Sequence, residues 1–204
     1  MADGEVADRF SRGQHAGSMG PAIALAKRLE IGEGDALLDV GGGSGAFTIS
    51  LCRRNPGLNA VIFDFPSALE VAAKLSAEAG VAGRVDYHAG NALTSEWPTG
   101  HNVVLMSYLF SAVDEPGIAH LLRQAFNTLP SGGRVVIHDF MVDDDKTGPQ
   151  DSALWFLTCM FNCPDGILLT PEFLKQALTE AGFTGISIDD LVPGLTRMAV
   201  ARKP

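Results

Sequence analysis

Residues 38–47 read LDVGGGSGAF, an apolar, strand-like run that ends in a loop of glycines. Glycine adopts backbone conformations that other residues avoid, and it lets a ligand approach the main chain closely. A helix that begins after such a loop presents free N–H groups in its first turn. The stretch therefore predicts a site for a nucleotide-like ligand between a strand and a helix. The two candidate ligands are a dinucleotide and S-adenosylmethionine (SAM).

The acidic residue in front of the glycines separates these two ligands. Asp39 precedes Gly41, Gly43 and Gly45 in the pattern D-x-G-x-G-x-G. A carboxylate at this place repels a pyrophosphate but attracts the ammonium and sulfonium groups of SAM. We therefore assign Asp39 and the three glycines to a SAM site.

Further cofactor candidates follow the next expected strands. Asp64 ends the second strand, in VIFDFP, where a carboxylate can accept both ribose hydroxyls; dinucleotide enzymes share this feature. Asn91 is expected to hydrogen-bond an adenine edge, with Phe65 and Ala92 against the ring faces, although asparagine is equally typical of a turn. Ser107, at the end of the fourth expected strand, is a further candidate for binding the cofactor.

Strand-like and helix-like segments alternate along the chain. Continuous apolar runs between amphipathic helices favour a parallel sheet that is covered on both faces. The expected strands are 36–40, 60–64, 84–88, 102–107, 134–140, 185–189 and 195–201, and the expected helices are 46–54, 67–79, 115–129, 149–162 and 171–181.

The last two strands depart from this alternation. Only a short turn with Pro193 and Gly194 joins them, so they must be antiparallel. Seven strands with a terminal hairpin differ from the six parallel strands of a dinucleotide-binding fold, and this favours SAM. We predict an α/β, doubly wound, seven-stranded, mostly parallel sheet with a C-terminal antiparallel hairpin. Residues 1–34 are expected to be an N-terminal helical segment and residues 35–204 the SAM-binding domain.

Composition limits the partners. The 204 residues include 15 Lys and Arg against 24 Asp and Glu, a net charge of −9, and no basic stretch indicates nucleic-acid binding. No apolar run is long enough to span a membrane. The three cysteines are an odd number, so we expect a reducing, cytoplasmic location. Their spacing does not indicate a metal site, and we predict none.

Several segments together resemble a known family. LLDVGGGSGAF, VIFDFP, RVDYHAGNAL, LPSGGRVVIHDFM and LTPEFLKQALTEAGF occur in the order seen in class I SAM-dependent methyltransferases. More narrowly, they resemble the caffeic-acid and acetylserotonin O-methyltransferase family, which includes members similar to bacteriochlorophyllide C-methyltransferases. The opening FSRGQHAGSMGPAIA resembles the helix before the SAM loop in bacterial members. The resemblance covers roughly residues 10 to 202 and implies SAM as the cofactor.

Two departures from the family matter. Members normally carry an N-terminal winged-helix domain that dimerises and closes the substrate pocket, and this chain has none. The chain is then natively short, is a fragment, or receives the domain from a partner; a homodimer and a separate partner chain both remain open. The family's general-base histidine is also replaced. In YLFSAVDE, Phe110 stands in the histidine position and Ser111 in the following aspartate position.

The remaining candidates surround the expected acceptor. Asp139 ends the fifth strand and is our candidate catalytic base; Phe110 is the second catalytic candidate, since an aromatic ring can stabilise the sulfonium. Trp155 lies in the apolar stretch ALWFLTCMF, which is either core or a wall of the acceptor pocket. By resemblance, Arg12 is expected to bind the SAM carboxylate and Asn162 to contact the substrate.

We therefore predict a SAM-dependent methyltransferase that acts on an oxygen or carbon atom of a small hydrophobic or aromatic acceptor. The alternative is a non-catalytic subunit of the same fold that needs a partner chain. An NAD-dependent oxidoreductase is disfavoured by Asp39, by the terminal hairpin and by the lack of a Tyr-x-x-x-Lys pair.

Overall fold

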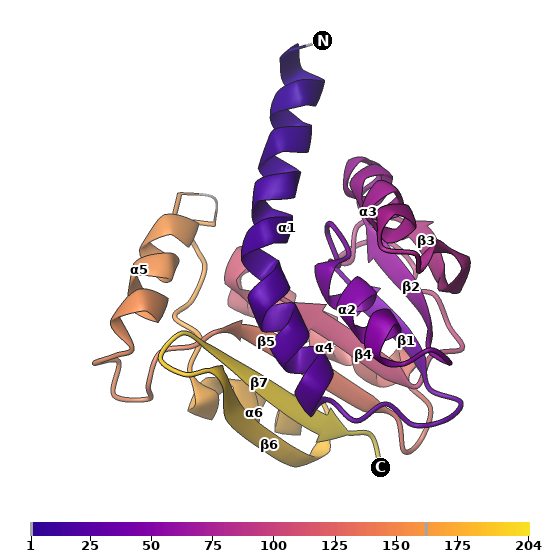
Figure 1. The fold of residues 1–204 in the computed structure, drawn as a ribbon. Coiled ribbons are helices and arrows are strands. Elements are labelled where there is room, and N and C mark those ends of the chain that lie inside the picture. Colours follow the sequence, from indigo (N-terminus) through magenta and orange to yellow (C-terminus); the bar gives the residue numbers. More distant parts are fainter. Residues whose placement is uncertain (1, 162) are drawn as a thin grey trace. The chain divides into compact units, whose positions relative to one another are not determined.

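The computed structural model describes the backbone of residues 2–161 and 163–204 and the side chains from residue 12 onward, except that of residue 162. The chain divides into two compact units, Met1–Pro98 and Thr99–Pro204. Figure 1 shows the first unit in indigo and purple and the second in pink to yellow.

The first unit consists of three parallel strands and the helices that accompany them. Its strands follow the order β3-β2-β1, with Asp39 paired to Ile62 and Ile62 paired to Tyr87. The first helix, α1, contacts α2 and α3. The elements are α1 (Ala2–Arg28), β1 (Ala36–Val40), α2 (Ala46–Arg54), β2 (Asn59–Asp64), α3 (Pro66–Glu78), the 3₁₀ turn η1 (Ala82–Arg84) and β3 (Val85–Ala89).

The glycine loop between β1 and α2 is fixed by its backbone. Gly41, Gly43 and Gly45 have φ angles of 68°, 55° and 77°, in the left-handed region that favours glycine. The N–H of Gly41 donates to the carbonyl of Phe63 at the end of β2, and the N–H of Gly45 donates to the carbonyl of Gly42. The loop is thus held against β2 and leads directly into α2.

The second unit is a mixed sheet with the order β4-β5-β7-β6. β4 and β5 are parallel, and β7 runs antiparallel to both β5 and β6. Side chains cap two helices: Asp114 accepts from the N–H of Gly117, and Thr170 accepts from that of Phe173. The elements are β4 (Val103–Ser107), the 3₁₀ turn η2 (Phe110–Ala112), α4 (Glu115–Thr128), β5 (Arg134–Phe140), α5 (Gln150–Cys159), α6 (Pro171–Glu180), β6 (Thr184–Val192) and β7 (Thr196–Arg202).

The predicted fold is confirmed: there are seven strands, and the last two form an antiparallel hairpin. The opening helix spans Ala2–Arg28, within the helical segment expected over residues 1–34. β6 is longer than expected and continues to Val192, because pairing with β7 extends through Asp190 and Arg197. The predicted boundary between residues 34 and 35 stays a prediction. The division into two compact units is a different one and falls between residues 98 and 99.

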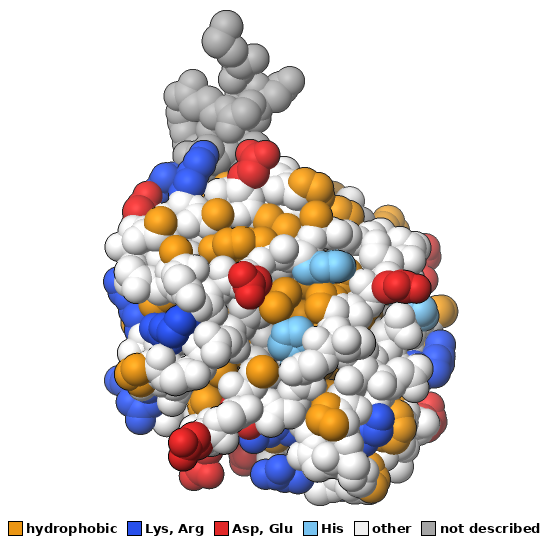
Figure 2. Space-filling model, turned by 90° about the vertical axis from the view of Figure 1, so that its right-hand side faces the viewer, with side chains coloured by type: hydrophobic (Ala, Val, Ile, Leu, Met, Phe, Trp, Pro, Cys, Tyr) orange, Lys and Arg blue, Asp and Glu red, His pale blue; other side chains and the backbone are white. Residues whose placement is uncertain are grey.

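Charged side chains are spread over the surface that Figure 2 draws. Lys and Arg appear there singly, between Asp and Glu, and form no continuous basic patch on this described face. In the described part of the chain, no helix has the length and apolar character that crossing a membrane requires.

The loop geometry predicts different costs for two Gly→Ala changes. At Gly45 the new Cβ would lie 2.9 Å from Cδ1 of Ile62, on a residue with positive φ, whereas at Gly57 nothing lies within 4 Å and φ is not positive. We expect Gly45→Ala to lower the free energy of unfolding by about 1–3 kcal/mol and Gly57→Ala to leave it nearly unchanged. Urea denaturation of the two variants measures this; equal stabilities would contradict the strained-loop description.

Candidate functional site

The candidate residues fall into two groups, one in each unit. In the first unit, the carboxylate of Asp64 holds the glycine loop. Its Oδ2 accepts from the N–H of Gly43 at 2.8 Å, and its Oδ1 accepts from the N–H of Phe65 at 2.6 Å. Burial raises the pKa of Asp64, and these two N–H groups oppose that rise. Each oxygen keeps a further lone pair, so the carboxylate can still accept from ligand hydroxyls.

Asp39 lies in β1, one residue before the strand ends, and its side chain is only 1% exposed. Oδ2 accepts from the hydroxyl of Thr48 in α2 at 2.6 Å. Oδ1 is buried and has no hydrogen-bond partner within the described residues. Burial raises the pKa of Asp39 to about 7; the Thr48 hydroxyl opposes this shift and the nearby charge of Asp64 adds to it. A positive group next to Asp39 would relieve this unfavourable burial.

The turn after β3 contains Asn91 and Ala92. Oδ1 of Asn91 accepts from the N–H of Leu93 at 2.9 Å, which is the turn role that the sequence left open. The indole N–H of Trp97 donates to the carbonyl of Ala92 at 2.9 Å and fixes this turn from the core. Phe65 is 55% exposed, so its ring is available to a planar ligand.

Helix α1 contributes a contact that the sequence did not indicate. Nδ1 of His15 hydrogen-bonds Oγ of Ser44, inside the glycine loop, at 2.9 Å. Burial lowers the pKa of His15, as does the neighbouring Arg12, while Glu78 raises it. The guanidinium of Arg12 lies 3.7 Å from the carboxylate of Glu78 on α3, and both side chains are exposed.

In the second unit, Asp139 near the end of β5 is fully buried. Its Oδ2 accepts from the N–H of Ser111 at 3.1 Å and its Oδ1 from the N–H of Phe140 at 2.9 Å. Burial raises the pKa of Asp139 to about 6, against the lowering effect of these hydrogen bonds. The group can therefore exchange a proton near neutral pH.

His138 alternates with Asp139 along β5 and has different partners. Its Nδ1 hydrogen-bonds the hydroxyl of Ser107 on β4 at 2.8 Å, and burial lowers its pKa to about 3. The imidazole is thus neutral at physiological pH. Tyr108 follows Ser107 with a φ angle of 56°, and its ring packs edge-on to His138 at 4.6 Å between centroids.

An aromatic row leads from this point to α5. Phe140 lies 5.1 Å from the ring of Tyr108 and stacks on Trp155 at 4.5 Å with an interplanar angle of 19°. Trp155 remains 37% exposed, whereas Phe110 in η2 is 1% exposed. Asn162, the other expected substrate contact, lies outside the described residues.

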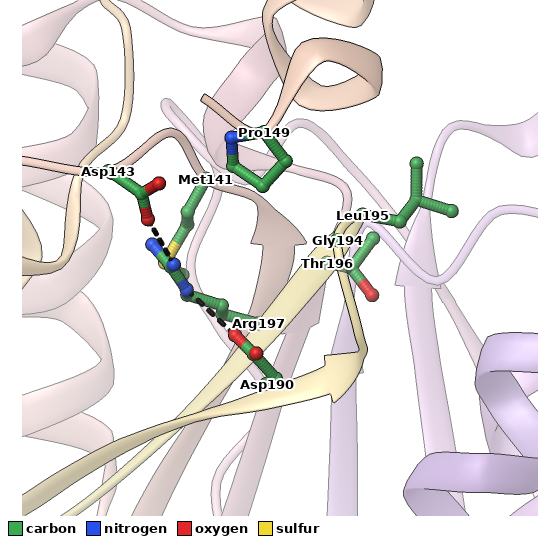
Figure 3. A pocket seen from close by; sticks show the side chains of 8 residues that line it. All are labelled: Met141, Asp143, Pro149, Asp190, Gly194, Leu195, Thr196 and Arg197. Carbon is green, nitrogen blue, oxygen red and sulfur yellow. Dashed lines mark hydrogen bonds and ion pairs between the residues drawn. The ribbon is translucent and has the colours of Figure 1, made fainter. Parts of the chain in front are cut away.

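A cavity of about 220 Å³ lies between the β6–β7 hairpin and the segment that leads to α5 (Figure 3). Arg197 crosses it: Nη2 is paired with Asp143, Nε with Asp190 at 3.0 Å, and Nη1 donates to the carbonyl of Val142. The guanidinium thereby connects the hairpin to the segment before α5. We attribute a structural role to it, which is to position the start of the segment that carries Trp155.

The residues of the first unit fit SAM. The unpartnered buried oxygen of Asp39 and the nearby carboxylate of Asp64 form an acidic region without a described cationic partner. Such a region suits the ammonium and sulfonium groups and is unfavourable for a pyrophosphate. An added Cβ at Gly43 would meet nothing within 4 Å, so the loop is open at that residue.

The comparisons with known proteins agree with this geometry. Residues 2–184 match the O-methyltransferase domain family, and the chain belongs to this family. It is 37% identical over 152 residues to a 3-hydroxy-5-methyl-1-naphthoate 3-O-methyltransferase of Streptomyces sahachiroi, covering 74% of this chain and 44% of the relative. It is 33% identical over 162 residues to an L-tyrosine C(3)-methyltransferase of Streptomyces lavendulae, covering 78% of this chain and 44% of the relative.

The solved structure of SibL, a SAM-dependent methyltransferase in its apo form, superimposes with a TM-score of 0.84 at 32% identity, covering 96% of this chain and 58% of that chain. The chain thus spans less than half the length of the two curated relatives. The family assignment confirms the predicted family and fold, and SAM is the cofactor of the methyltransferases in this family.

Sequence reasoning found the acidic and glycine residues but missed the groups that hold them. Thr48 and His15 act through hydrogen bonds to residues on other elements, and Trp97 through a hydrogen bond to Ala92 within its own loop. Phe140 was missed as the stacking partner of Trp155. Only Trp97 gave a signal, because a tryptophan in a short polar loop indicates an anchored turn.

The buried carboxylate predicts a pH-dependent stability. The pKa of Asp39 is raised from 3.8 to about 7 in the folded chain. The stabilisation from the protonated side chain is therefore complete below pH 4, and it is lost as pH rises toward 7. Between pH 4 and pH 7 the free energy of unfolding falls by up to about 1.4 kcal/mol per pH unit. We expect Asp39→Asn to flatten the decline, measured as unfolding free energy at pH 5 to 8.

Asp86→Asn is the matched control, since Asp86 is exposed on β3. If wild type and Asp39→Asn lose stability in parallel over this range, Asp39 does not titrate near neutrality.

Proposed function

We propose that this chain transfers the methyl group of SAM to an oxygen or carbon atom of a small aromatic acceptor. The observation that carries the proposal is the acidic, glycine-lined end of β1 and β2 in a chain of the O-methyltransferase domain family. The relatives named above act on a hydroxynaphthoate and on tyrosine. Both are phenol-type aromatic compounds, which supports an acceptor of that class.

The first unit supplies the cofactor residues in this proposal. Asp64 accepts the ribose hydroxyls, Phe65 and Ala92 contact the adenine, and the amide of Asn91 donates to its edge. Asp39 and the glycine loop receive the methionine part, and Arg12 belongs to the same set. Ser107, at the end of β4 in the second unit, is the further proposed cofactor residue. The hydrogen bonds that fix Asp64 and the Ala92 turn support these roles, because a preorganised group loses less entropy on binding.

The second unit supplies the acceptor residues. Trp155, supported from behind by Phe140, offers a half-exposed ring for stacking. Asn162 is the further proposed contact. Phe110 cannot accept a proton, so Asp139 is the proposed base. The ring of Phe110 is buried, which does not support the expected cation–π contact with a sulfonium. SAM supplies an activated methyl group; the chain's own groups orient the acceptor and receive its proton.

Calorimetric titration with SAM, and with NADH in parallel, tests the cofactor assignment. We expect SAM to bind and NADH not to bind. Asp64→Asn should weaken SAM binding about 10- to 100-fold, which corresponds to roughly 1.5–3 kcal/mol for hydrogen bonds to a charged group. Asp86→Asn on the neighbouring strand should bind like the wild type. Binding of NADH in place of SAM would overturn the proposal.

We also propose that an apolar edge on α5 and the following turn contacts another protein chain. The apolar edge consists of Leu154 (51% exposed), Leu157 (59%), Met160 (56%) and Phe161 (89%). Four large apolar side chains this exposed within eight residues are unfavourable in water and mark an interaction surface. The partner is a second copy or a separate chain that supplies part of the length present in the relatives.

Polar substitutions in the apolar edge should change the oligomeric state of the chain. Leu154→Ser with Phe161→Ser should convert a dimer to a monomer in light scattering, or abolish binding of the hydrophobic dye ANS if the wild type is monomeric. Ile23→Ser, which changes an exposed apolar residue on α1, is the control. A wild type that is monomeric and binds no more dye than the double variant would contradict this assignment.

A further inference from the structure

The glycine loop between β1 and α2 is held at neighbouring residues by groups from two other elements. The N–H of Gly43 donates to the carboxylate of Asp64, at the end of β2, at 2.8 Å. The hydroxyl of Ser44, the next residue, hydrogen-bonds Nδ1 of His15 on α1 at 2.9 Å. A helix that precedes the loop by a whole strand therefore fixes one of its central side chains.

This part of the loop needs such support. Ser44 lies between Gly43 and Gly45, which both have a positive φ angle. Glycine loses more conformational freedom on folding than any other residue, so ordering this stretch is costly. Packing contributes little here, because an added Cβ at Gly43 would meet nothing within 4 Å and Ser44 is only half-buried. The order of the loop before a ligand binds therefore depends on its hydrogen bonds.

His15 reaches the loop because of its place on α1. Position 15 precedes the buried Ala22 by seven residues, which is close to two helical turns, so the two lie on the same face of the helix. The residues directly before and after His15 are exposed, whereas His15 is half-buried. The imidazole thus continues, as a polar group, the buried face of α1 that is formed by Ala22, Leu25, Ala26 and Leu29.

Two charged groups act on His15. Its pKa is lowered by burial and by the charge of Arg12, one turn earlier on α1, while Glu78 on α3 raises it. The imidazole is therefore neutral above pH 7, and a neutral ring can either donate to or accept from the Ser44 hydroxyl. Arg12 and Glu78 themselves form an exposed ion pair at 3.7 Å. Exposed pairs of this kind contribute little, so this pair does not replace the hydrogen bond to the loop.

We propose that His15 is a positioning residue for SAM. Its hydrogen bond to Ser44 holds the glycine loop in the conformation that receives the methionine part of the cofactor. A loop that is ordered in advance loses less entropy when the ligand binds, so this bond raises the affinity for SAM. The inference rests on the cofactor roles proposed above and deepens them, because it adds α1 to the elements that determine cofactor binding.

The competing role for His15 is only to attach α1 to the first unit. The buried face of α1 already does this, since Ala22 and Leu25 have no exposed surface and α1 contacts α2. A half-buried hydrogen bond adds little to such an attachment. If attachment were its role, losing the bond would loosen the whole unit, and any side chain that packs equally well would serve at position 15.

Calorimetric titration of the full chain with SAM, slightly above neutral pH, tests the proposal. We expect His15→Ala to weaken SAM binding about 3- to 10-fold, the effect of losing one hydrogen bond of ordinary net strength. His15→Asn should restore most of the affinity, because an asparagine amide can donate to or accept from the Ser44 hydroxyl. His120→Ala, which changes a half-buried histidine on α4 in the second unit, is the control and should bind SAM like the wild type.

Two further measurements separate positioning from folding. Ser44→Ala and the double variant with His15→Ala should bind SAM with nearly equal affinity, because the second change removes nothing once the bond is absent. Without SAM, amide hydrogen exchange in the loop should be faster in His15→Ala than in the wild type, while exchange in β2 should be unchanged.

Three results would overturn the positioning role while the SAM site stands. They are a His15→Ala variant that binds SAM within about twofold of the wild type, a His15→Asn variant that binds no better than His15→Ala, and exchange that becomes faster in β2 as well as in the loop. A wild type that does not bind SAM would instead overturn the proposed cofactor site, and this inference with it.

Discussion

The structure depends on carboxylates that are buried at the ends of parallel strands. Asp39 on β1, Asp64 on β2 and Asp139 on β5 each accept a hydrogen bond from a hydroxyl or N–H group on a different loop or helix. No described cation pairs with any of the three. Burial without a counter-charge is costly and raises the pKa of each group. Such costs persist where the charge is needed for binding or proton transfer.

The three carboxylates are tuned differently by their donors. Asp64 is less buried and accepts two short N–H bonds, so it suits a permanent acceptor of hydrogen bonds. Asp39 has one hydroxyl donor and one unpartnered oxygen, which suits a cationic ligand. Asp139 has an N–H donor on each oxygen, and burial raises its pKa to about 6, which suits a group that gains and loses a proton. In the proposed function, a carboxylate at the end of a strand thus accepts hydrogen bonds in one place, binds a cationic group in another and takes up a proton in a third.

The fold, and the placement of acidic and glycine residues at the strand ends of the first unit, were predictable from the sequence. Short apolar runs, positive-φ glycines and acidic strand ends are local features, and parallel strands place them on one edge of their sheet. Partners across the sheet or from other helices were not predictable. Nothing near Asp39 indicates that Thr48 satisfies it, and His15 precedes Ser44 by a helix and a strand. The assignment of Asn91 stayed open because an asparagine after a strand serves a turn and a ligand equally well.

The acceptor half shows why a substitution must be interpreted with its neighbours. Phe110 in place of histidine removes a base from η2, and from the sequence alone this indicates lost proton transfer. In the fold, the N–H of Ser111 in the same short turn donates to the buried carboxylate of Asp139 on β5. Phe110 is itself buried and anchors η2, so the residue that removes the histidine also fixes the serine beside it.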